Sequence, residues 1–487
     1  MLKEMAISTD LYQLTMAQAY WQAGRQDLDA SFYLHFRENP FSGGYAIACG
    51  IAQVAEYIEG FSFSEEDLCY LASLKAQNDT LLFDPVFLNT LADLSLSCDI
   101  DAVAEGTVVF PHEPLIRVMG PILQCQLIET MLLNLVGFET IIATKAARIC
   151  SVAHGPVAEF GLRRAQGPAG AIYAARAAIV GGCASTSNVA AGKLFGVPVS
   201  GTHAHSWVMA FESELEAFRA FAQAFPHNCT LLVDTYDVMK GVAHAVIVGL
   251  EMAQRGERLA AIRIDSGDLA WLSKQARILL NEAGLDYVKI IASNDLDEYT
   301  IASLNAEQGA CIDGWGVGTK LATAFDQPAL GCVYKMSATR GGAKDGERME
   351  WKPCLKISEQ VQKSTLPGVL GVRRYVSNEG IMVGDMIYDV NTPPTEDRII
   401  DPTDELRQKD LSAALSHELL IPLIREGAVV AQVPSALEAQ QNALKSLAQL
   451  DTSNKRLLNP HSYPVGLERV LHATRDRLIR EARGIFE

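Results

Sequence analysis

Between residues 155 and 320, short apolar segments recur, and a helical pattern follows each of them. The six segments end near Phe160, Gly201, Asp234, Asp265, Ser293 and Val317. Their spacing of about 25 to 40 residues is the size of a strand–helix unit, which predicts a parallel sheet with helical crossovers. No G-x-G-x-x-G follows the first strand, and polar residues follow nearly every strand. Both observations favour closure of the sheet into a barrel over an open sheet with one switch point.

The two ends of the chain lack this alternation. The first roughly 120 residues mix helical and strand-like segments. After Lys335, strand-like segments such as VLGVRRYV and IMVGDMIYDV have no helices between them. A chain of 487 residues is long enough for more than one domain. We therefore predict an α/β fold, with an α/β barrel over residues 141–335 and a flanking α+β domain made of residues 1–140 and 336–487, whose tail is helical.

Composition narrows the classes of function. The net charge of −17 argues against non-specific binding to nucleic acid or to an anionic membrane surface. No apolar stretch reaches about 18 residues without a charge, so no membrane span is expected. The N-terminus lacks the apolar core of a signal peptide. The ten cysteines form no C-x-x-C pair and several lie in apolar runs, which is typical of reduced thiols. We expect a cytoplasmic enzyme.

Polar residues follow the predicted strands, and three groups of them each indicate a particular kind of ligand. The G-V-G-T run at 316–319 offers backbone amides with little side-chain bulk, which suits a phosphate, and residues 293–294 can add donors. Arg263 and Asp265 alternate along one strand, so they face the same side, where they suit an anion and a sugar hydroxyl. Phe160 beside Arg163 suits an aromatic acid.

Each group has a structural alternative. The G-V-G-T run can be a tight turn, and Arg263 with Asp265 can be an ion pair inside the barrel. Phe160 can be a core residue, and Asp234 can cap a helix. The joint position of these residues at successive strand ends favours a site.

Two histidines within three residues, His203 and His205, follow the second predicted strand. Such a pair suits two ligands of one metal ion in a metal-dependent barrel hydrolase. That class needs further histidines at later strand ends, and the ends at Asp265 and Ser293 have none. The hydrolase is therefore the weaker alternative.

The strand ends lie in longer segments that resemble the nicotinate phosphoribosyltransferases, a family of type II phosphoribosyltransferases. The matching segments are TDLYQ (9–13), EFGLRRAQGP (159–168), SNVAAG (187–192), GTHAHS (201–206), IRIDSGDL (262–269) and GWGVGT (314–319). The resemblance implies an irregular α/β barrel with a flanking α+β domain. It also implies the first step of NAD salvage from nicotinate: nicotinate and 5-phosphoribosyl pyrophosphate give nicotinate mononucleotide and pyrophosphate, coupled to hydrolysis of ATP.

The resemblance further implies roles for single residues. His205 is the position that ATP phosphorylates, Asp265 is the ribose contact and a candidate Mg²⁺ ligand, and His203 receives no role. The implied nicotinate contacts are Tyr12, Phe160, Arg163, Thr202 and Arg263, with Tyr12 supplied by the second subunit of a homodimer. The implied phosphoribosyl pyrophosphate contacts are Ser266, Gly267, Asp268, Ser293, Asn294, Gly316, Gly318 and Thr319. ATP is expected as a co-substrate and Mg²⁺ as a cofactor.

The choice between nicotinate and nicotinamide depends on charge. Similar enzymes that use nicotinamide place an aspartate near the substituent of the pyridine ring. The corresponding stretch here, GGCASTSN (181–188), contains no acid. An acid would repel a carboxylate and an arginine attracts it, so the sequence favours nicotinate, with nicotinamide as the alternative.

Overall fold

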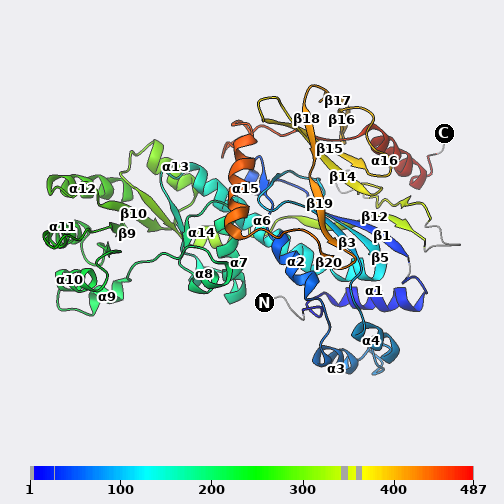
Figure 1. The fold of residues 1–487 in the computed structure, drawn as a ribbon, viewed down its shortest axis with the longest axis horizontal. Coiled ribbons are helices and arrows are strands. Elements are labelled where there is room, and N and C mark those ends of the chain that lie inside the picture. Colours follow the sequence, from blue (N-terminus) through cyan, green and yellow to red (C-terminus); the bar gives the residue numbers. More distant parts are fainter. Residues whose placement is uncertain (1–4, 27, 342–348, 358–364, 486–487) are drawn as a thin grey trace. The chain divides into compact units, whose positions relative to one another are not determined.

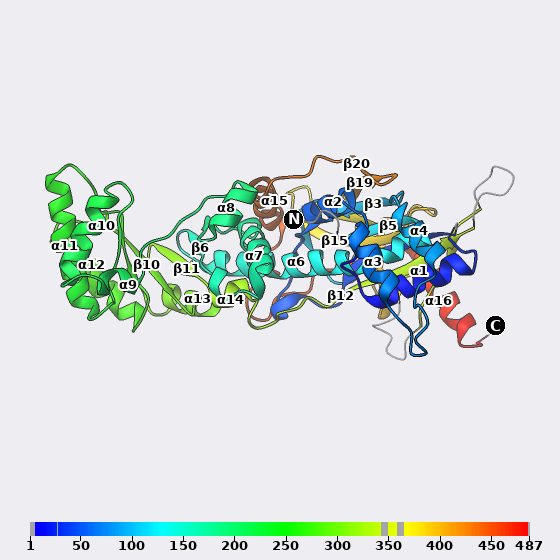
Figure 2. The same cartoon turned by 90° about the horizontal axis from the view of Figure 1, so that it is seen from below.

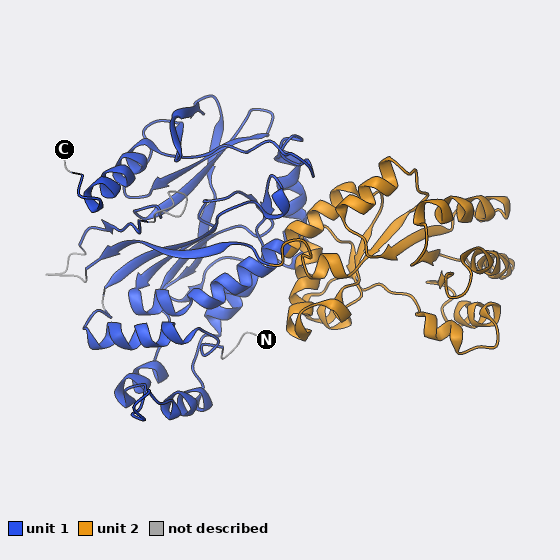
Figure 3. Ribbon diagram, turned by 180° about the vertical axis from the view of Figure 1, so that it is seen from behind, with its two compact units in different colours: residues 1–141, 329–487 blue, residues 142–328 orange. Residues whose placement is uncertain are grey.

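The computed structural model describes residues 5–26, 28–341, 349–357 and 365–485 (Figures 1 and 2). The chain divides into two compact units (Figure 3). Unit 1 consists of residues 1–141 and 329–487, and unit 2 consists of residues 142–328. Unit 1 therefore combines segments from both ends of the chain.

The larger sheet of unit 1 has seven strands in the order β13-β12-β1-β5-β3-β19-β20. Their bounds are β1 (Asp29–Phe36), β3 (Asp99–Val103), β5 (Ile116–Pro121), β12 (Cys332–Arg340), β13 (Lys352–Pro353), β19 (Leu420–Arg425) and β20 (Ala428–Val429). Strand β1 pairs antiparallel with β5 on one side and with β12, about 300 residues later, on the other. All but the first residue of β1 are buried, as expected for a strand near the middle of a covered sheet.

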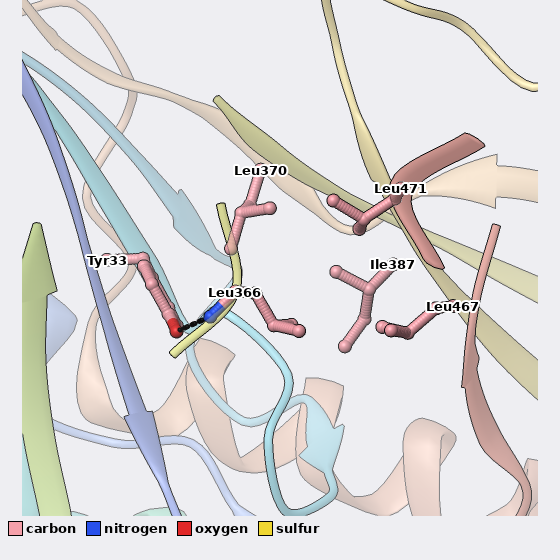
Figure 4. Packing of buried hydrophobic residues seen from close by; sticks show 6 residues of the cluster. All are labelled: Tyr33, Leu366, Leu370, Ile387, Leu467 and Leu471. Carbon is pink, nitrogen blue, oxygen red and sulfur yellow. Dashed lines mark hydrogen bonds between the residues drawn. The ribbon is translucent and has the colours of Figure 1, made fainter. Parts of the chain in front are cut away.

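A second, six-stranded sheet of unit 1 has the order β17-β16-β21-β15-β14-β18. Its strands are β14 (Leu370–Val376), β15 (Met382–Asp389), β16 (Arg398–Asp401), β17 (Asp404–Asp410), β18 (Leu415–Glu418) and β21 (Val465–Leu467). A small pair, β2 (Ala46–Ile47) with β4 (Val108–Val109), completes the unit. Buried residues Tyr33, Leu366, Leu370, Ile387, Leu467 and Leu471 join the first sheet to the second and to helix α16 (Arg469–Ala482) (Figure 4). Within this cluster the Leu366 N–H donates to the Tyr33 hydroxyl over 2.9 Å.

The helices of unit 1 lie around these sheets. They are α1 (Leu11–Gln22), α2 (Ile51–Glu59), α3 (Glu65–Ser73), α4 (Pro85–Ala92), α5 (Ile122–Leu127), α15 (Ala436–Gln449) and α16. Trp21 of α1 packs on Phe87 of α4, with ring centroids 5.9 Å apart. Helix α6 (Glu129–Val152) crosses the unit boundary. No helix within the described parts of the chain is both long and apolar enough to cross a membrane.

The sheet of unit 2 is parallel and has the order β7-β6-β11-β10-β9-β8. Its strands are β6 (Val157–Glu159), β7 (Ser185–Thr186), β8 (Thr230–Leu232), β9 (Ala261–Ile264), β10 (Lys289–Asn294) and β11 (Gly314–Val317). The crossovers contain α7 (Gly167–Val180), α8 (Val189–Phe195), α9 (His205–Met209), α10 (Glu214–Ala224), α11 (Val238–Gln254), α12 (Leu269–Glu282) and α13 (Glu298–Ala306) (Figure 1). A short helix, α14 (Thr319–Ala322), follows the last strand of the sheet, β11. The predicted α/β class, with a parallel sheet and helical crossovers, is confirmed.

The hydrogen-bond ladder of this sheet does not close into a full barrel among the described strands, because β7 and β8 are its edges. Residues 197–201, which we predicted as a strand, make only one bridge, between Val199 and Thr186. Pro198 has no N–H to donate to a further strand, which limits pairing here. The two-residue strand β7, which the sequence pattern did not predict, takes the sixth place in the sheet.

Aspartates start the helices that follow three of the predicted strands. The side chains of Asp237, Asp268 and Asp297 accept the backbone N–H of Lys240, Trp271 and Thr300, respectively. These caps satisfy amides that have no partner inside the helix. Each crossover helix therefore starts at a fixed point just beyond its strand, and the loop between strand and cap is held in place.

Candidate active site

The carboxyl ends of β6, β7 and β9, together with residues 201–205, line a cavity of about 330 Å³ in unit 2. Its lining residues are Phe160, Leu162, Arg163, Ser187, Gly201, Thr202, His203, Ala204, His205, Arg263 and Asp265. The structure thus brings together six of the predicted site residues, from segments more than 100 positions apart: Phe160, Arg163, Thr202, His205, Arg263 and Asp265. Ligands of parallel α/β sheets bind at this end of the strands.

Phe160 supplies an aromatic surface, and contacts with β11 fix both its backbone and its ring. Its N–H donates to the Val317 carbonyl over 2.8 Å. Its ring packs directly over Gly316, where an added Cβ would lie 2.6 Å from Cε2 of the ring. The glycine of β11 therefore makes room for the ring of Phe160. The ring is half-buried, which leaves part of it available to a planar ligand.

Gly316→Ala is expected to displace the Phe160 ring, because a Cβ at 2.6 Å overlaps a ring carbon that the backbone holds in place. The KM for the aromatic substrate should rise about 10-fold, measured by steady-state kinetics. Gly170→Ala is the matched control, because no atom lies within 4 Å of its added Cβ and Gly170 lies within a helix. An unchanged KM in Gly316→Ala would show that the ring does not contact substrate.

Glu159 positions the turn that follows Phe160, and sequence reasoning gave it no role. Its side chain is buried and accepts hydrogen bonds from the Thr186 hydroxyl, over 2.6 Å, and from the Gly161 N–H. Burial raises the pKa of this carboxyl. The sequence signal that could have identified Glu159 is its position at a strand end, directly before the aromatic Phe160.

Arg263 of β9 presents an unsatisfied donor to the cavity. Its Nη2 donates to the His203 carbonyl over 3.1 Å, while its Nε is buried and has no hydrogen-bond partner. Burial lowers the pKa of the guanidinium, and Asp265 and Asp234 oppose this shift. Because an arginine stays charged in proteins, a buried N–H without a partner favours an anionic ligand.

Two carboxylates organise the ends of β8 and β9. Oδ2 of Asp234 accepts the Asp265 N–H over 3.0 Å and the Ser266 hydroxyl over 2.6 Å. The Ser293 hydroxyl donates to Oδ1 of Asp265. Ser266 and Ser293, predicted as substrate contacts, therefore give their protons to these carboxylates. Oδ1 of Asp234 is buried and has no partner.

His205 is the first residue of α9 and lies half-buried in the cavity wall. Its Nδ1 is 3.2 Å from the Thr235 hydroxyl, just beyond β8. The other ring nitrogen, Nε2, has no hydrogen-bond partner in the described part of the chain. The ring is therefore fixed through one nitrogen, and the other is left for a ligand.

Sequence comparisons match the whole chain to one group of enzymes. The N-terminal domain of nicotinate phosphoribosyltransferase (NAPRTase) matches residues 7–137, the NAPRTase family matches residues 156–409, and its C-terminal domain matches residues 371–475. The nicotinate phosphoribosyltransferase of Bacillus subtilis is 42% identical and covers 99% of this chain and 97% of its own. The chain belongs to the nicotinate phosphoribosyltransferase family.

More distant members of this family agree. The Caenorhabditis elegans nicotinate phosphoribosyltransferase is 35% identical, over 95% of this chain and 91% of its own. The crystal structure of human nicotinic acid phosphoribosyltransferase superposes with a TM-score of 0.82 at 31% identity, covering 96% of this chain and 99% of the human one. The fold and the family therefore hold over nearly the full length.

His203, whose role the sequence left open, is a structural residue in this member of the nicotinate phosphoribosyltransferase family. Its Nε2 accepts the Leu232 N–H over 3.1 Å, and its ring packs on Phe221 with centroids 4.7 Å apart. A nitrogen that accepts a backbone N–H has no lone pair left for a metal. The pair of His203 and His205 therefore does not form the metal clamp of the hydrolase alternative.

Burial, and secondarily the nearby Arg263 and His205, lower the pKa of His203 from 6.5 to about 4. The folded chain thus binds fewer protons at this ring than the unfolded chain between those values, so stability is lost as the pH falls from about 6.5 to 4. His203→Gln keeps an acceptor that does not titrate. We measure the free energy of unfolding by urea titration at pH 7 and at pH 4. Between these pH values, the loss of unfolding free energy should be about 1–2 kcal/mol smaller in His203→Gln than in the unaltered chain. Exposed His227→Gln should keep the original slope.

The other predicted residues do not line the cavity. Asp268 caps α12, Gly267 has a φ of 80° that favours glycine, and Gly318 precedes α14, which begins at Thr319. Ser293 pairs with Gly316, and Asn294 with Val317, so the ends of β10 and β11 lie side by side. Asn294 has a strained φ of 134°.

Tyr12 belongs to the other compact unit. It lies in the first turn of α1 and is 48% exposed. Burial of part of the ring, together with Glu129 and Asp10, raises the pKa of its hydroxyl.

Proposed function

We propose that this chain transfers the phosphoribosyl group of 5-phosphoribosyl pyrophosphate to the ring nitrogen of nicotinate, coupled to hydrolysis of ATP through a phosphohistidine at His205. The observation that carries the proposal is the buried, unpartnered Nε–H of Arg263 in a cavity that also contains the Phe160 ring. A charged donor and an aromatic surface in one cavity match the carboxylate and the ring of nicotinate.

Charge in the cavity supports nicotinate over nicotinamide. Arg163 and Arg263 line it, and Asp265 is the one carboxylate among its lining residues. Ser187, the residue of the 181–188 stretch that lines the cavity, carries no charge. A carboxylate supplies a charged acceptor for the Nε–H of Arg263, whereas a neutral amide supplies a weaker one.

In the proposed transfer, the pyridine nitrogen attacks the anomeric carbon as the bond from that carbon to the pyrophosphate oxygen breaks. The nitrogen–carbon bond forms, and pyrophosphate leaves with the electron pair. Phe160 and Arg263 hold the ring in line with the anomeric carbon, which removes most of the entropic cost of the encounter. Tyr12 of the partner subunit would cover the second face of the ring in a homodimer. Asp265, fixed by Asp234 and Ser293, would hold the ribose hydroxyls.

The carboxylates at the ends of β8 and β9 fit Mg²⁺. Oδ1 of Asp234 is a buried oxygen without a partner, and Asp265 lies beside it with its N–H bonded to Oδ2 of Asp234. Carboxylate oxygens are the ligands that Mg²⁺ prefers, so these two residues would hold it. When bound, Mg²⁺ neutralises charge that develops on pyrophosphate. The remaining contacts proposed for 5-phosphoribosyl pyrophosphate are the amides and hydroxyls at the ends of β10 and β11: Ser293, Asn294, Gly316, Gly318 and Thr319.

The phosphoryl step follows from the geometry of His205. Its neutral Nε2 would attack the γ-phosphorus of ATP, so that a nitrogen–phosphorus bond forms and ADP leaves with the bridging oxygen. Water later hydrolyses the phosphohistidine to phosphate. Thr235, bonded to Nδ1, holds the ring so that Nε2 is the attacking atom. We also infer a cytoplasmic location, because all ten cysteines are free thiols, as expected in a reducing compartment.

An isotopic assay tests the proposal. Labelled nicotinate and labelled nicotinamide are supplied in parallel, each with 5-phosphoribosyl pyrophosphate, Mg²⁺ and ATP, and mononucleotide, pyrophosphate and ADP are quantified. We expect mononucleotide and pyrophosphate in equal amounts from nicotinate, and turnover of nicotinamide lower by about 100-fold or more. Absence of pyrophosphate release, or a preference for nicotinamide, would overturn the proposal.

A further inference from the structure

Unit 1 contains a second, smaller cavity of about 80 Å³, built entirely from its own residues. Its wall includes four members of the buried cluster of Figure 4: Tyr33, Leu366, Ile387 and Leu467. The proposed reaction assigns nothing to this cavity, which shares no lining residue with the cavity of unit 2.

Among the described residues, two buried nitrogens in the side chains that line this cavity lack a hydrogen-bond partner. Nδ1 of His35, on β1, and Nε of Arg475, on α16, are buried and make no hydrogen bond. His35 is 8% exposed and Arg475 is 6% exposed. An unsatisfied buried polar atom costs about 1–3 kcal/mol, so two at one cavity favour an occupant that hydrogen-bonds to both.

Both side chains are held in place by other contacts. Nη1 of Arg475 donates to the Pro402 carbonyl over 3.0 Å and is 3.9 Å from a carboxylate oxygen of Asp476. These contacts leave Nε without a hydrogen-bond partner among the described residues. The His35 ring stacks on Tyr33, with centroids 4.9 Å apart and planes inclined by 16°. Both side chains are therefore fixed in the cavity wall, so a ligand that bonds to them pays little further cost in side-chain entropy.

Several basic groups lie near His35, and Arg475 lines the same cavity. Burial, followed by the nearby His112, Arg37 and Lys335, lowers the pKa of His35 to about 3. His35 is thus neutral at physiological pH and can carry a proton on Nδ1, while Arg475 keeps its charge. Positive charge next to two unused N–H donors selects an anion, and the aliphatic wall selects an apolar body attached to it.

We propose that this cavity is a binding site for a short-chain aliphatic carboxylate. The carboxylate accepts from Arg475 Nε–H and His35 Nδ1–H, and the alkyl group packs on Leu366, Ile387 and Leu467. A cavity of about 80 Å³ suits a small organic acid rather than a nucleotide. Free phosphate shares the charge and lacks the apolar body, so it fits only the polar half of the cavity.

Titration of the full chain with isobutyrate, followed by saturation-transfer NMR, tests the proposal. We expect a Kd on the order of 1 mM, as suits a ligand of six heavy atoms. Arg475→Met should weaken binding by about 10-fold or more, and His35→Phe, which keeps the stacked ring, by about 3-fold or more. Arg477→Met is the matched control: it lies on the same helix, is exposed and pairs with Glu481, and it should bind as the unaltered chain does.

Three comparisons distinguish a carboxylate site in this cavity from a general anion site and from binding in the cavity of unit 2. Isobutyramide has the shape without the charge and should bind about 10-fold more weakly or worse, and inorganic phosphate should not displace isobutyrate. Binding should survive Arg263→Met and saturating nicotinate. The proposal would be overturned if isobutyrate did not bind up to about 50 mM, or if Arg475→Met and His35→Phe bound it as tightly as the unaltered chain. It would also be overturned if Arg263→Met lost binding or if nicotinate competed with isobutyrate. A thermal melt of each variant verifies that it is folded. Arg475→Met and His35→Phe each remove one proposed contact with the ligand, so they test the site independently.

Discussion

Replacing Arg263 by methionine is expected to lower kcat/KM for nicotinate by about 100- to 1,000-fold. The Arg263 side chain is half-buried in the cavity wall, and its buried Nε–H has no hydrogen-bond partner among the described residues. A charged hydrogen bond to a buried carboxylate contributes about 3–4 kcal/mol, and each 1.4 kcal/mol corresponds to a factor of ten. Methionine keeps the length and the apolar packing of the side chain, so the loss reports the charge. Steady-state kinetics with varied nicotinate measures it.

Nicotinamide serves as the internal reference for this prediction. The amide carries no negative charge, so its slow turnover should change by less than about 10-fold in Arg263→Met, and discrimination between the two substrates should collapse. Arg255→Met is the matched control, because Arg255 lies in the same unit, is exposed and pairs with Glu257. If Arg263→Met slowed both substrates equally, Arg263 would not be the contact of the carboxylate.

Much of the site was predictable because of a general property of parallel sheets. Residues that follow successive strands meet at one edge, whatever their separation in the sequence. Phe160, His205, Arg263 and Asp265 follow or end three different segments of the repeat, and the structure gathers them around one cavity. The spacing of the repeat therefore carried the prediction, without knowledge of any contact.

The failures have local physical causes. Residues 197–201 read as a strand by hydrophobicity, yet Pro198 lacks the N–H that a ladder needs, and only Val199 bridges. Strand β7 consists of Ser185 and Thr186, too short and too polar for a pattern of alternation to reveal. Closure of the sheet into a barrel depends on the pairing of such short strands. The sequence therefore predicted the α/β class of the fold, but not whether the hydrogen-bond ladder closes.

The roles of single residues were harder to predict, since they depend on partners far along the chain. Ser266 is bonded to Asp234, 32 positions earlier, and Ser293 to Asp265, 28 positions earlier. Gly316 has the spacing of a phosphate-binding run, whereas its missing side chain makes room for the Phe160 ring. Residue type and spacing predicted which positions belong to the site, and only the three-dimensional contacts distinguish a ligand contact from its support.

His205→Ala is expected to abolish the phosphoenzyme and the stimulation of transfer by ATP, while transfer without ATP stays within about 10-fold of the unaltered chain. The reason is that His205 presents the one nitrogen proposed to accept the phosphoryl group. Its Nδ1 is bonded to Thr235, and its Nε2 is left open to the cavity. Labelling with ATP that carries ³²P in the γ position, followed by alkali-stable counting, measures the phosphohistidine. Mononucleotide formed with and without ATP measures the coupling.

Two further variants sharpen this test. Thr235→Val keeps the shape of the side chain and removes its hydroxyl, so the ring of His205 loses its fixed orientation. Phosphorylation should slow by about 10-fold without vanishing, since the nitrogen is still present. His227→Ala, at an exposed loop position, should label as the unaltered chain does and thereby exclude a second acceptor. Full ATP coupling in His205→Ala would mean that phosphoryl transfer runs through another group, and the open Nε2 of His205 would then need a different role, such as a hydrogen-bond donor to pyrophosphate.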